Sequence, residues 1–268
     1  MFAYFYVKFT CLQEFGCSIQ CNYYFCSVEI NILDTTKIMD ESLKEYFTLA
    51  LSVDCVVFGF DDEGLKVLLI ERSAEPFNGY WALPGDLVHP RKDLNQSVNE
   101  VLFNLTGISD LYFEQVETFG EVNRHPFGRV ITASYYTLVK ISDYKLNPAS
   151  FAREARWFLL KDVGSLAFDH NAILNSCFNR LTKSVRMNPI GFELLPKMFT
   201  LSELQSLYEA ILGETLDTRN FRKKVAKMNI LKDTKKTQKS VSHRPAKLFS
   251  FDEQKYYELK KTGFNFEL

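Results

Sequence analysis

Hydrophobic and polar positions along the chain predict strands first and helices later. Residues 52–60 and 65–72 are runs of β-branched and aromatic residues, joined by the turn DDEG. They predict a β-hairpin in which Gly64 is free to take a positive φ. Residues 73–86 are punctuated by prolines and glycines and predict an irregular loop. Three further stretches have a strand pattern, at 111–122, 128–141 and 154–160.

Apolar residues at spacings of three and four predict the helices. The first helix follows Asp93, which forms a capping box with Gln96, and it ends at Gly107. A second helix begins at Asp169 or His170, where Asp169 is expected to be the N-cap. Strands and helices that do not strictly alternate indicate an α+β or a layered α/β/α domain.

The C-terminal region has the element order of a winged helix-turn-helix. Thr200 and Glu203 form a capping box at the start of an amphipathic helix that ends at Gly213. Asp217 then caps a second helix, which is followed by a basic stretch and the strand-like AKLFSF. In such folds the second helix enters the major groove of DNA, and basic residues hold phosphates. The segment 187–196, with two prolines and a glycine, is the predicted domain boundary.

The distribution of charge supports this interpretation. Residues 217–247 hold eleven Lys and Arg against two Asp and Glu, whereas the remainder has 21 basic and 31 acidic residues. A basic block on an otherwise acidic protein indicates a local anionic partner. The alternative is an ordinary helical hairpin with a charged, solvated surface. The predicted contacts to DNA are Arg219, Asn220, Arg222, Lys223 and Lys227 on the second helix, and Lys235, Lys236, Lys239, His243 and Arg244 in the wing.

The N-terminal residues differ in composition from the rest. Residues 1–38 hold four of the six cysteines, are rich in Phe and Tyr, and show no sustained period. We expect them to be an extension outside the fold, with Met39 as the native start; a small cysteine-rich extension is the alternative. The chain has no C-x-x-C pair for zinc, no convincing signal peptide and no run of 18 apolar residues. We therefore expect a reduced, cytoplasmic protein that does not contact a membrane.

A further pattern surrounds the first helix. The segment WALPGDLVHPRKDLNQSVNEVLFNLTGI, residues 81–108, closely resembles a Nudix box. The framework of the box is present in Trp81, Pro84, Gly85, Leu102, Gly107 and Ile108. Its chemistry is replaced: Asp86 stands for the box glycine, Lys92 for the first glutamate, Glu100 for the arginine, and Val101, Asn104 and Leu105 for the helix glutamates.

These replacements remove what the box uses for catalysis. Nudix hydrolases hold Mg²⁺ with clustered carboxylates, so that water can attack a diphosphate. Val101 and Leu105 offer no anionic oxygen, and Lys92 would repel the ion. Glu100 lies one residue from the first helix glutamate of the motif, which is about 100° round the helix. We therefore expect no hydrolase activity, no catalytic residue, no bound metal and no cofactor, with the helix kept as scaffold.

Together with the later segments, this pattern resembles a family of Nudix-related transcriptional regulators. Those segments are FEQVETFGEVNRHPFGRVITASYYTLV, RWFLLKDVGSLAFDH, FTLSELQSLYEAILGETLDTRNFRKKV and RPAKLFSF, and the resemblance covers about residues 48–255. It implies an α+β chain, with a Nudix-like α/β/α sandwich and mixed sheet at 39–190 and a winged helix-turn-helix domain at 191–268. It also implies a repressor that binds a partly palindromic operator in double-stranded DNA as a homodimer and responds to a small-molecule effector.

Members of this family respond to ADP-ribose or related nucleotides, or to sugars, with arabinose prominent. This chain has RHPFGR where the family often has RDPRGR, and WALPGD where WALPGG is usual. Both changes suit a polyanionic nucleotide poorly, so the sequence favours a monosaccharide such as L-arabinose. The predicted effector contacts are Arg72, Trp81, Asp86, His89, Asn123 and Arg129.

Simpler interpretations exist for several of these residues and for the whole chain. Trp81 suits the core, His89 suits a turn before Pro90, and Arg72 could pair with a neighbouring glutamate. Three other functions stay open: a regulator that senses a nucleotide, a divergent Nudix hydrolase with a basic RNA-binding tail, and a partner-binding scaffold on an inert Nudix fold.

Overall fold

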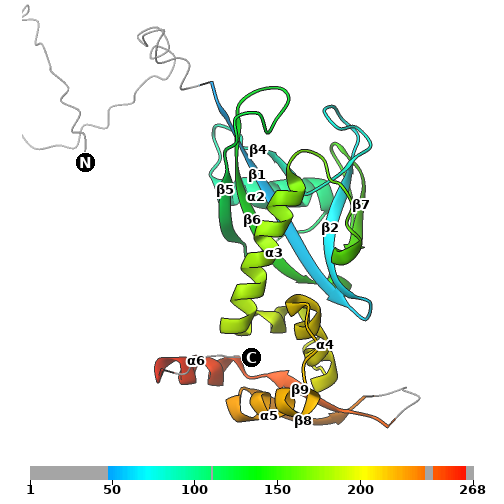
Figure 1. Ribbon diagram of the computed structural model, residues 1–268, viewed down its shortest axis with the longest axis vertical. Coiled ribbons are helices and arrows are strands. Elements are labelled where there is room, and N and C mark those ends of the chain that lie inside the picture. The colour runs from blue at the N-terminus through cyan, green and yellow to red at the C-terminus, as the bar shows by residue number, and fades with distance from the viewer. Residues whose placement is uncertain (1–47, 110, 239–243, 264–268) are drawn as a thin grey trace, which may run out of the picture. The chain divides into compact units, whose positions relative to one another are not determined.

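The N-terminal part of the described chain is a mixed β-sheet between two helices (Figure 1). The computed structural model describes residues 48–109, 111–238 and 244–263, so the predicted extension at 1–38 lies outside the described residues. The strand order is β3-β2-β1-β6-β5, with β4 beside β1 and β7 beside β2. β1 and β6 are parallel, and the other pairs of this sheet are antiparallel. The bounds are β1 Ala50–Asp61, β2 Gly64–Arg72, β3 Trp81–Ala82, β4 Gly85–Leu87, β5 Glu114–Phe119, β6 Val130–Lys140 and β7 Ala152–Leu159.

Alternation along β1 divides the core of the sheet into two layers. Val53, Cys55 and Val57 pack with α2 (Leu94–Thr106), and Val56 and Phe58 pack with α3 (His170–Met187). Successive side chains of a strand point to opposite faces, so a strand covered on both sides needs a nearly continuous apolar run. The sequence SVDCVVFGF provides that run, and the predicted α/β/α sandwich with a mixed sheet is confirmed.

Local sequence sets the limits of α2. Asp93 and Gln96 form the predicted capping box, and Gly107 ends the helix with a φ of 80°. A side chain on Gly107 would also lie 3.0 Å from the Cβ of Asn147. The predicted irregular loop at 73–86 is wrong in part, because β3 pairs with β2 and β4 pairs with β1 within and just after it. Strands of two and three residues are too short to show a hydrophobic period.

After α3 the chain forms the predicted winged helix. The 3-10 helix η5 (Pro189–Leu194) leads to α4 (Leu201–Leu212), α5 (Thr218–Met228) and the hairpin of β8 (Leu231–Thr237) and β9 (Lys247–Phe251). Phe199 forms an isolated bridge with Phe249, which adds a third extended segment to the hairpin. The capping box of Thr200 and Glu203 and the cap at Asp217 are both present.

The sequence pattern does not predict α6 (Glu253–Lys261). Asp252 caps this helix by accepting a hydrogen bond of 3.1 Å from the N–H of Lys255. Tyr256 is its buried residue, and a single buried side chain in nine positions gives no clear helical period. Within the described residues, no helix is both long enough and apolar enough to span a membrane.

Candidate functional site

Charged and aromatic side chains from separate loops meet around Arg72 at the end of β2. The Arg72 guanidinium lies 5.1 Å from the centroid of the Phe168 ring and 5.3 Å from that of Phe151. The His125 ring stacks on Phe168, with centroids 5.2 Å apart and an interplanar angle of 12°. Phe77 packs edge-on against Phe168 at 4.7 Å. We refer to Arg72, Phe77, His125 and Phe168 as the Arg72 cluster.

Two aromatic residues of the Arg72 cluster have a backbone conformation that L-residues rarely adopt. Phe77 has a φ of 66° and Phe168 a φ of 54°. Such a conformation costs on the order of 1–3 kcal/mol for each bulky residue, and residues of this kind gather at ligand sites and switch regions. The contact between the two rings is part of what holds them there. The Arg72 cluster is therefore a candidate ligand site.

A buried polar pair lies next to this cluster. Asp54 on β1 and His170 at the start of α3 are each 5% exposed, with His170 Nε2 3.6 Å from Oδ1 of Asp54. The N–H of Leu83 donates to His170 Nδ1 at 2.9 Å, so the neutral ring carries its proton on Nε2, facing Asp54. Burial lowers the pKa of His170 and raises the pKa of Asp54. Gly85 approaches so closely that a Cβ there would lie 1.7 Å from the Asp54 carboxylate.

An ion pair connects the loop between β5 and β6 with the start of α3. Arg124 donates from Nε and Nη2 to the two carboxylate oxygens of Asp169, at 2.8 and 2.6 Å, and from Nη1 to Thr132. The Arg124 side chain is 5% exposed. Asp169 stands at the N-cap of α3, as expected, but the prediction that it caps the helix is wrong, because its side chain makes no capping hydrogen bond. Its carboxylate binds the arginine instead.

Two of the predicted effector residues lie together, and a third lies elsewhere. Burial lowers the pKa of Arg72, and Asp86 lies close enough for its negative charge to offset part of this shift. Trp81 packs on Phe158, with ring centroids 4.6 Å apart, in the core layer of α3. The rings beside Arg72 pack with the layer of α2 instead. The structure therefore does not bring Trp81 to the Arg72 cluster.

The other three predicted effector residues serve turns. His89 Nδ1 accepts a hydrogen bond from the N–H of Arg91, in agreement with the turn interpretation. Arg129 donates from Nη1 to the carbonyl of Gly120 at 2.6 Å, across the loop between β5 and β6. Asn123 is exposed in the same loop. Whether these residues touch an effector stays a prediction.

The sequence pattern did not single out Phe168, and it did not show the partners of the next two residues, Asp169 and His170. Phe168 contacts Arg72, Phe77 and His125, which lie between 43 and 96 residues earlier in the chain. Asp169 and His170 stood out as an acid next to a histidine, but only the fold shows their partners. The available signal was this Phe-Asp-His run directly before a predicted helix.

The box helix does not fit a metal ion. Val101 is 7% and Leu105 is 1% exposed, and both belong to the core layer of α2. Lys92 forms an ion pair with Glu100, so the carboxylate of this helix already has a cationic partner. No group of three or more His, Cys, Asp or Glu side chains that could hold a metal occurs in the described part of the chain. These residues therefore do not provide the anionic oxygens that Mg²⁺ requires.

The winged helix exposes a basic face on α5. Arg219, Asn220, Arg222, Lys223 and Lys227 are all exposed, as the helical period predicts. The opposite face is buried and holds Phe221, Val225 and Met228. In the wing, Lys235, Lys236 and Arg244 are exposed, whereas the predicted contacts Lys239 and His243 lie outside the described residues.

Two polar side chains of α4 fix the turn that leads into α5. Gln205 donates from Nε2 to the carbonyl of Leu216 at 2.9 Å and to the hydroxyl of Thr218 at 3.2 Å. Glu209 accepts a hydrogen bond of 2.8 Å from the N–H of Leu216. Because Gln205 is buried, these bonds are shielded from water and hold the start of α5 against α4. The basic face is thus presented on a rigid support.

Comparison with known proteins matches both halves of the chain. Residues 191–251 match the family model of the NrtR DNA-binding winged helix domain, and residues 48–180 match that of the NUDIX domain. The ADPR responsive transcriptional repressor NtrR of Acinetobacter baylyi is 34% identical over 216 residues, which cover 79% of this chain and 86% of that relative. The chain belongs to the NrtR family of Nudix-related transcriptional regulators.

Two further relatives of this NrtR-family chain match different shares of its length. Shewanella oneidensis NrtR, solved in complex with a 27mer DNA, is 29% identical with a TM-score of 0.63, and the match covers 81% of this chain and 97% of that one. An ADP-ribose pyrophosphatase of Methanocaldococcus jannaschii is 30% identical over 137 residues, which are 51% of this chain and 79% of the enzyme. The similarity to this hydrolase thus covers about half of the chain, whereas the match to NrtR covers most of it.

Proposed function

We propose that this NrtR-family protein is a transcriptional repressor controlled by a small-molecule effector. Its winged helix, which we assign to residues 191–268, binds an operator in double-stranded DNA. Its Nudix-like domain, assigned to residues 39–190, binds the effector and releases the DNA. The observation that carries the proposal is a combination in one chain: an exposed basic face on α5 and a sensor domain that does not fit a metal. The match to an ADPR responsive repressor covers 86% of the length of that relative.

ADP-ribose or a related nucleotide is the effector class that we favour. Guanidinium groups bind phosphates. Burial lowers the pKa of His125, and Arg124 and Arg72 both lie close enough to lower it further. The rings of the Arg72 cluster offer faces on which a base or ribose can stack. Asp86 would disfavour a nucleotide if it were a free acid of the ligand site. In the structure Asp86 is exposed near Arg72, and its carboxylate accepts a hydrogen bond from the N–H of Leu87 at 2.7 Å, so its charge already has partners.

A monosaccharide such as L-arabinose is the second candidate effector. The loop between β5 and β6 carries Phe127, which is 72% exposed and has its ring edge-on to His125. An exposed aromatic ring beside a histidine offers a face on which a neutral sugar can stack. The name of the Acinetobacter baylyi relative supports the nucleotide instead, so the sugar reading ranks below it.

The proposed DNA contacts follow from the helix-turn-helix geometry. The second helix of such a motif lies in the major groove, where Arg and Asn read base edges and Lys holds phosphates. Two-fold related half-sites are read by two copies of the motif, so we propose that the protein acts as a homodimer. The exposed residues of α5 and the wing supply these contacts.

Fluorescence anisotropy on labelled duplexes from the protein's own upstream region tests the DNA-binding proposal. We expect tight binding that survives moderate salt on one duplex and not on its scrambled counterpart, because base contacts add to the phosphate contacts. Binding that is equal on both duplexes and disappears at moderate salt would remove the operator from the proposal.

A phosphate-release assay tests the hydrolase alternative, which the similarity to the Methanocaldococcus jannaschii enzyme keeps in view. The protein is incubated with ADP-ribose and Mg²⁺, and the products are treated with a phosphatase. We expect no release above background, because Lys92 pairs with Glu100 where a metal site would need free carboxylates. Release that requires Mg²⁺ and is lost in Glu100→Gln would favour the enzyme.

A further inference from the structure

Helix α3 links the Arg72 cluster with the winged helix. The ring of His170, its first residue, lies 5.2 Å from the Phe168 ring. Near its other end, Thr182 donates to the carbonyl of Ile211 on α4 at 3.4 Å, and Arg186 forms an ion pair of 3.1 Å with Glu214 just after α4. An 18-residue helix is about 27 Å long. Helix α3 therefore extends from the Arg72 cluster to α4, which supports α5 (Figure 1).

Three consecutive residues hold the first turn of α3 in place. Phe168 packs in the Arg72 cluster, with a left-handed φ of 54°. Asp169 makes two hydrogen bonds with Arg124, and His170 accepts one from the N–H of Leu83. None of these contacts is a capping bond of α3 itself. The first turn of α3 is thus held partly by the Arg72 cluster and partly by Arg124 and Leu83, which lie next to it.

We propose that effector binding is transmitted to the winged helix through α3, and that the Arg124–Asp169 ion pair is the contact on which the effector acts. This inference rests on the proposed function. Asp169 is in this account a positioning residue, which acts on DNA binding through α3. It belongs neither to the DNA contacts nor to the effector contacts.

The chemistry of Arg124 explains how an anionic effector would act on this pair. A guanidinium has five N–H donors, and three bonds to Asp169 and Thr132 leave donors on both Nη atoms. A phosphate or carboxylate that binds Arg124 competes with Asp169 for the charge. Release of Asp169 frees the first turn of α3, whose strained neighbour Phe168 then loses a restraint. An effector that favours the released state must weaken DNA binding by the same factor by which DNA weakens effector binding.

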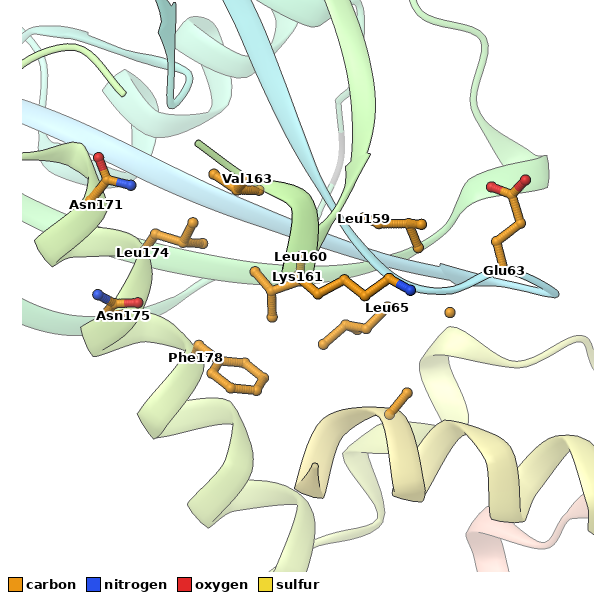
Figure 2. A pocket seen from close by; sticks show the side chains of 12 residues that line it. Glu63, Leu65, Leu159, Leu160, Lys161, Val163, Asn171, Leu174, Asn175 and Phe178 are labelled. Carbon is orange, nitrogen blue, oxygen red and sulfur yellow. The ribbon is translucent and has the colours of Figure 1, made fainter. Parts of the chain in front are cut away.

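A cavity along the first half of α3, between this helix and α4, leaves room for movement. It has a volume of about 490 Å³ and lies between α3, the β1–β2 turn, the end of β7 with η4 (Leu160–Asp162), and α4. Leu174 and Phe178 line it from α3 (Figure 2). Ala210 lines it from α4. Closely packed helices resist displacement, whereas a gap between them permits it at low cost. The junction of α3 and α4 is therefore suited to a change of packing.

The test compares Asp169→Asn with the wild-type protein in the full chain. Operator affinity is measured by anisotropy with and without ADP-ribose, and ADP-ribose affinity by calorimetry. For the wild type we expect ADP-ribose to weaken operator binding between about 5-fold and 150-fold, the usual range of allosteric coupling. For Asp169→Asn we expect an operator affinity about 10-fold weaker without effector, an unchanged or tighter ADP-ribose affinity, and a residual coupling below about 2-fold.

Two further variants separate coupling from stability. Glu154→Gln removes one negative charge from an exposed pair with Arg156 on β7, and we expect it to keep the wild-type coupling. Ala210→Leu fills the cavity from α4 without touching the Arg72 cluster. We expect it to retain both binding affinities and to lower the coupling several-fold, because the packing can no longer shift. A purely structural role of Asp169 would lower the melting temperature and leave the ratio of operator affinities unchanged.

The outcomes distinguish this inference from the function on which it rests. A wild-type protein that ignores ADP-ribose and L-arabinose, or binds no operator, contradicts the proposed function. A wild-type protein that responds, with Asp169→Asn and Ala210→Leu responding equally, overturns the role of α3. If Asp169→Asn does not fold, wild-type coupling in Ala210→Leu alone is sufficient to overturn it.

Discussion

At the scale of single residues, this chain places polar groups in its interior with and without partners. Asp54 and His170 are buried together, and Leu83 fixes the tautomer of the histidine. Their neighbours come from distant parts of the chain. The sequence therefore shows which polar residues are present but not which contacts they make. The sequence also does not show on which face of the sheet Trp81 lies, because this depends on how β3 pairs with β2. That register depends on tertiary packing, which no local pattern encodes.

Tyr208 in α4 is predicted to be a destabilising residue. Its side chain is 0% exposed, and its hydroxyl has no hydrogen-bond partner among the described residues. An unsatisfied buried hydroxyl costs about 1–3 kcal/mol, so Tyr208→Phe should raise the free energy of unfolding by about 1 kcal/mol. Thermal unfolding followed by circular dichroism should show a melting temperature about 2–4 °C higher.

Tyr136→Phe is the matched control for this substitution. The hydroxyl of Tyr136 donates to Glu114 at 2.8 Å, so its removal should lower the melting temperature. A Tyr208→Phe protein that is less stable than the wild type would show that the hydroxyl has a partner.

The buried His170 predicts a pH dependence of stability. Its pKa is lowered by burial, whereas the unfolded chain protonates this histidine below about pH 6.5. The stability that the neutral ring contributes is therefore present above pH 6.5 and is lost as the pH falls, by at most about 1.4 kcal/mol per pH unit. His170→Asn removes this titration, and its side-chain oxygen can still accept from Leu83. Melting temperatures between pH 7.5 and 5.5 should fall more steeply in the wild type; parallel curves would contradict the assignment.

At the scale of elements, helices with caps were predictable and short or weakly patterned elements were not. The limits of α2, α4 and α5 follow from local capping residues, which act within one turn of the helix. β3, β4 and α6 have too few buried positions to show a period. Asp169 has the right residue type for a cap and lies at the right position, yet Arg124 takes its carboxylate. A stronger tertiary partner overrides a local preference in this case.

The exposed face of α5 predicts the effect of Arg222→Ala on DNA binding. Arg222 is exposed, and its Nη2 donates to the hydroxyl of Ser202 at 3.5 Å. The substitution should therefore leave the melting temperature unchanged and weaken operator binding by about 1–3 kcal/mol. The slope of log affinity against log salt concentration should become smaller by about one. Anisotropy over a salt series measures both effects.

Arg180→Ala is the control for this substitution. Arg180 lies on α3, away from the basic face, in an exposed ion pair of 3.3 Å with Glu114. It should retain wild-type operator affinity. Equal losses in both variants would indicate a non-specific effect of charge rather than a contact of α5.

At the scale of the whole molecule, the chain combines a Nudix-like domain with a winged helix that has an exposed basic face on α5. The Nudix framework persists because Leu102 and Leu105 of α2 complete the core of the sheet, which does not depend on metal. The sequence predicted both halves and their order. The effector contacts stay a prediction. Arg124 and His125 lie on the loop between β5 and β6 and Phe168 lies just before α3, so only the fold brings these two parts of the chain together. The link between the halves, α3, follows from the fold alone.

The most direct test of this account is the titration of a preformed complex of the protein and its labelled operator with ADP-ribose, followed by anisotropy at fixed salt, with L-arabinose in a parallel titration. We expect ADP-ribose to release the DNA in a saturable manner and L-arabinose to leave the complex intact. A complex that L-arabinose releases and ADP-ribose does not would contradict the nucleotide and restore the sugar. A complex that resists both would contradict the central claim that the Nudix-like domain controls DNA binding through either effector.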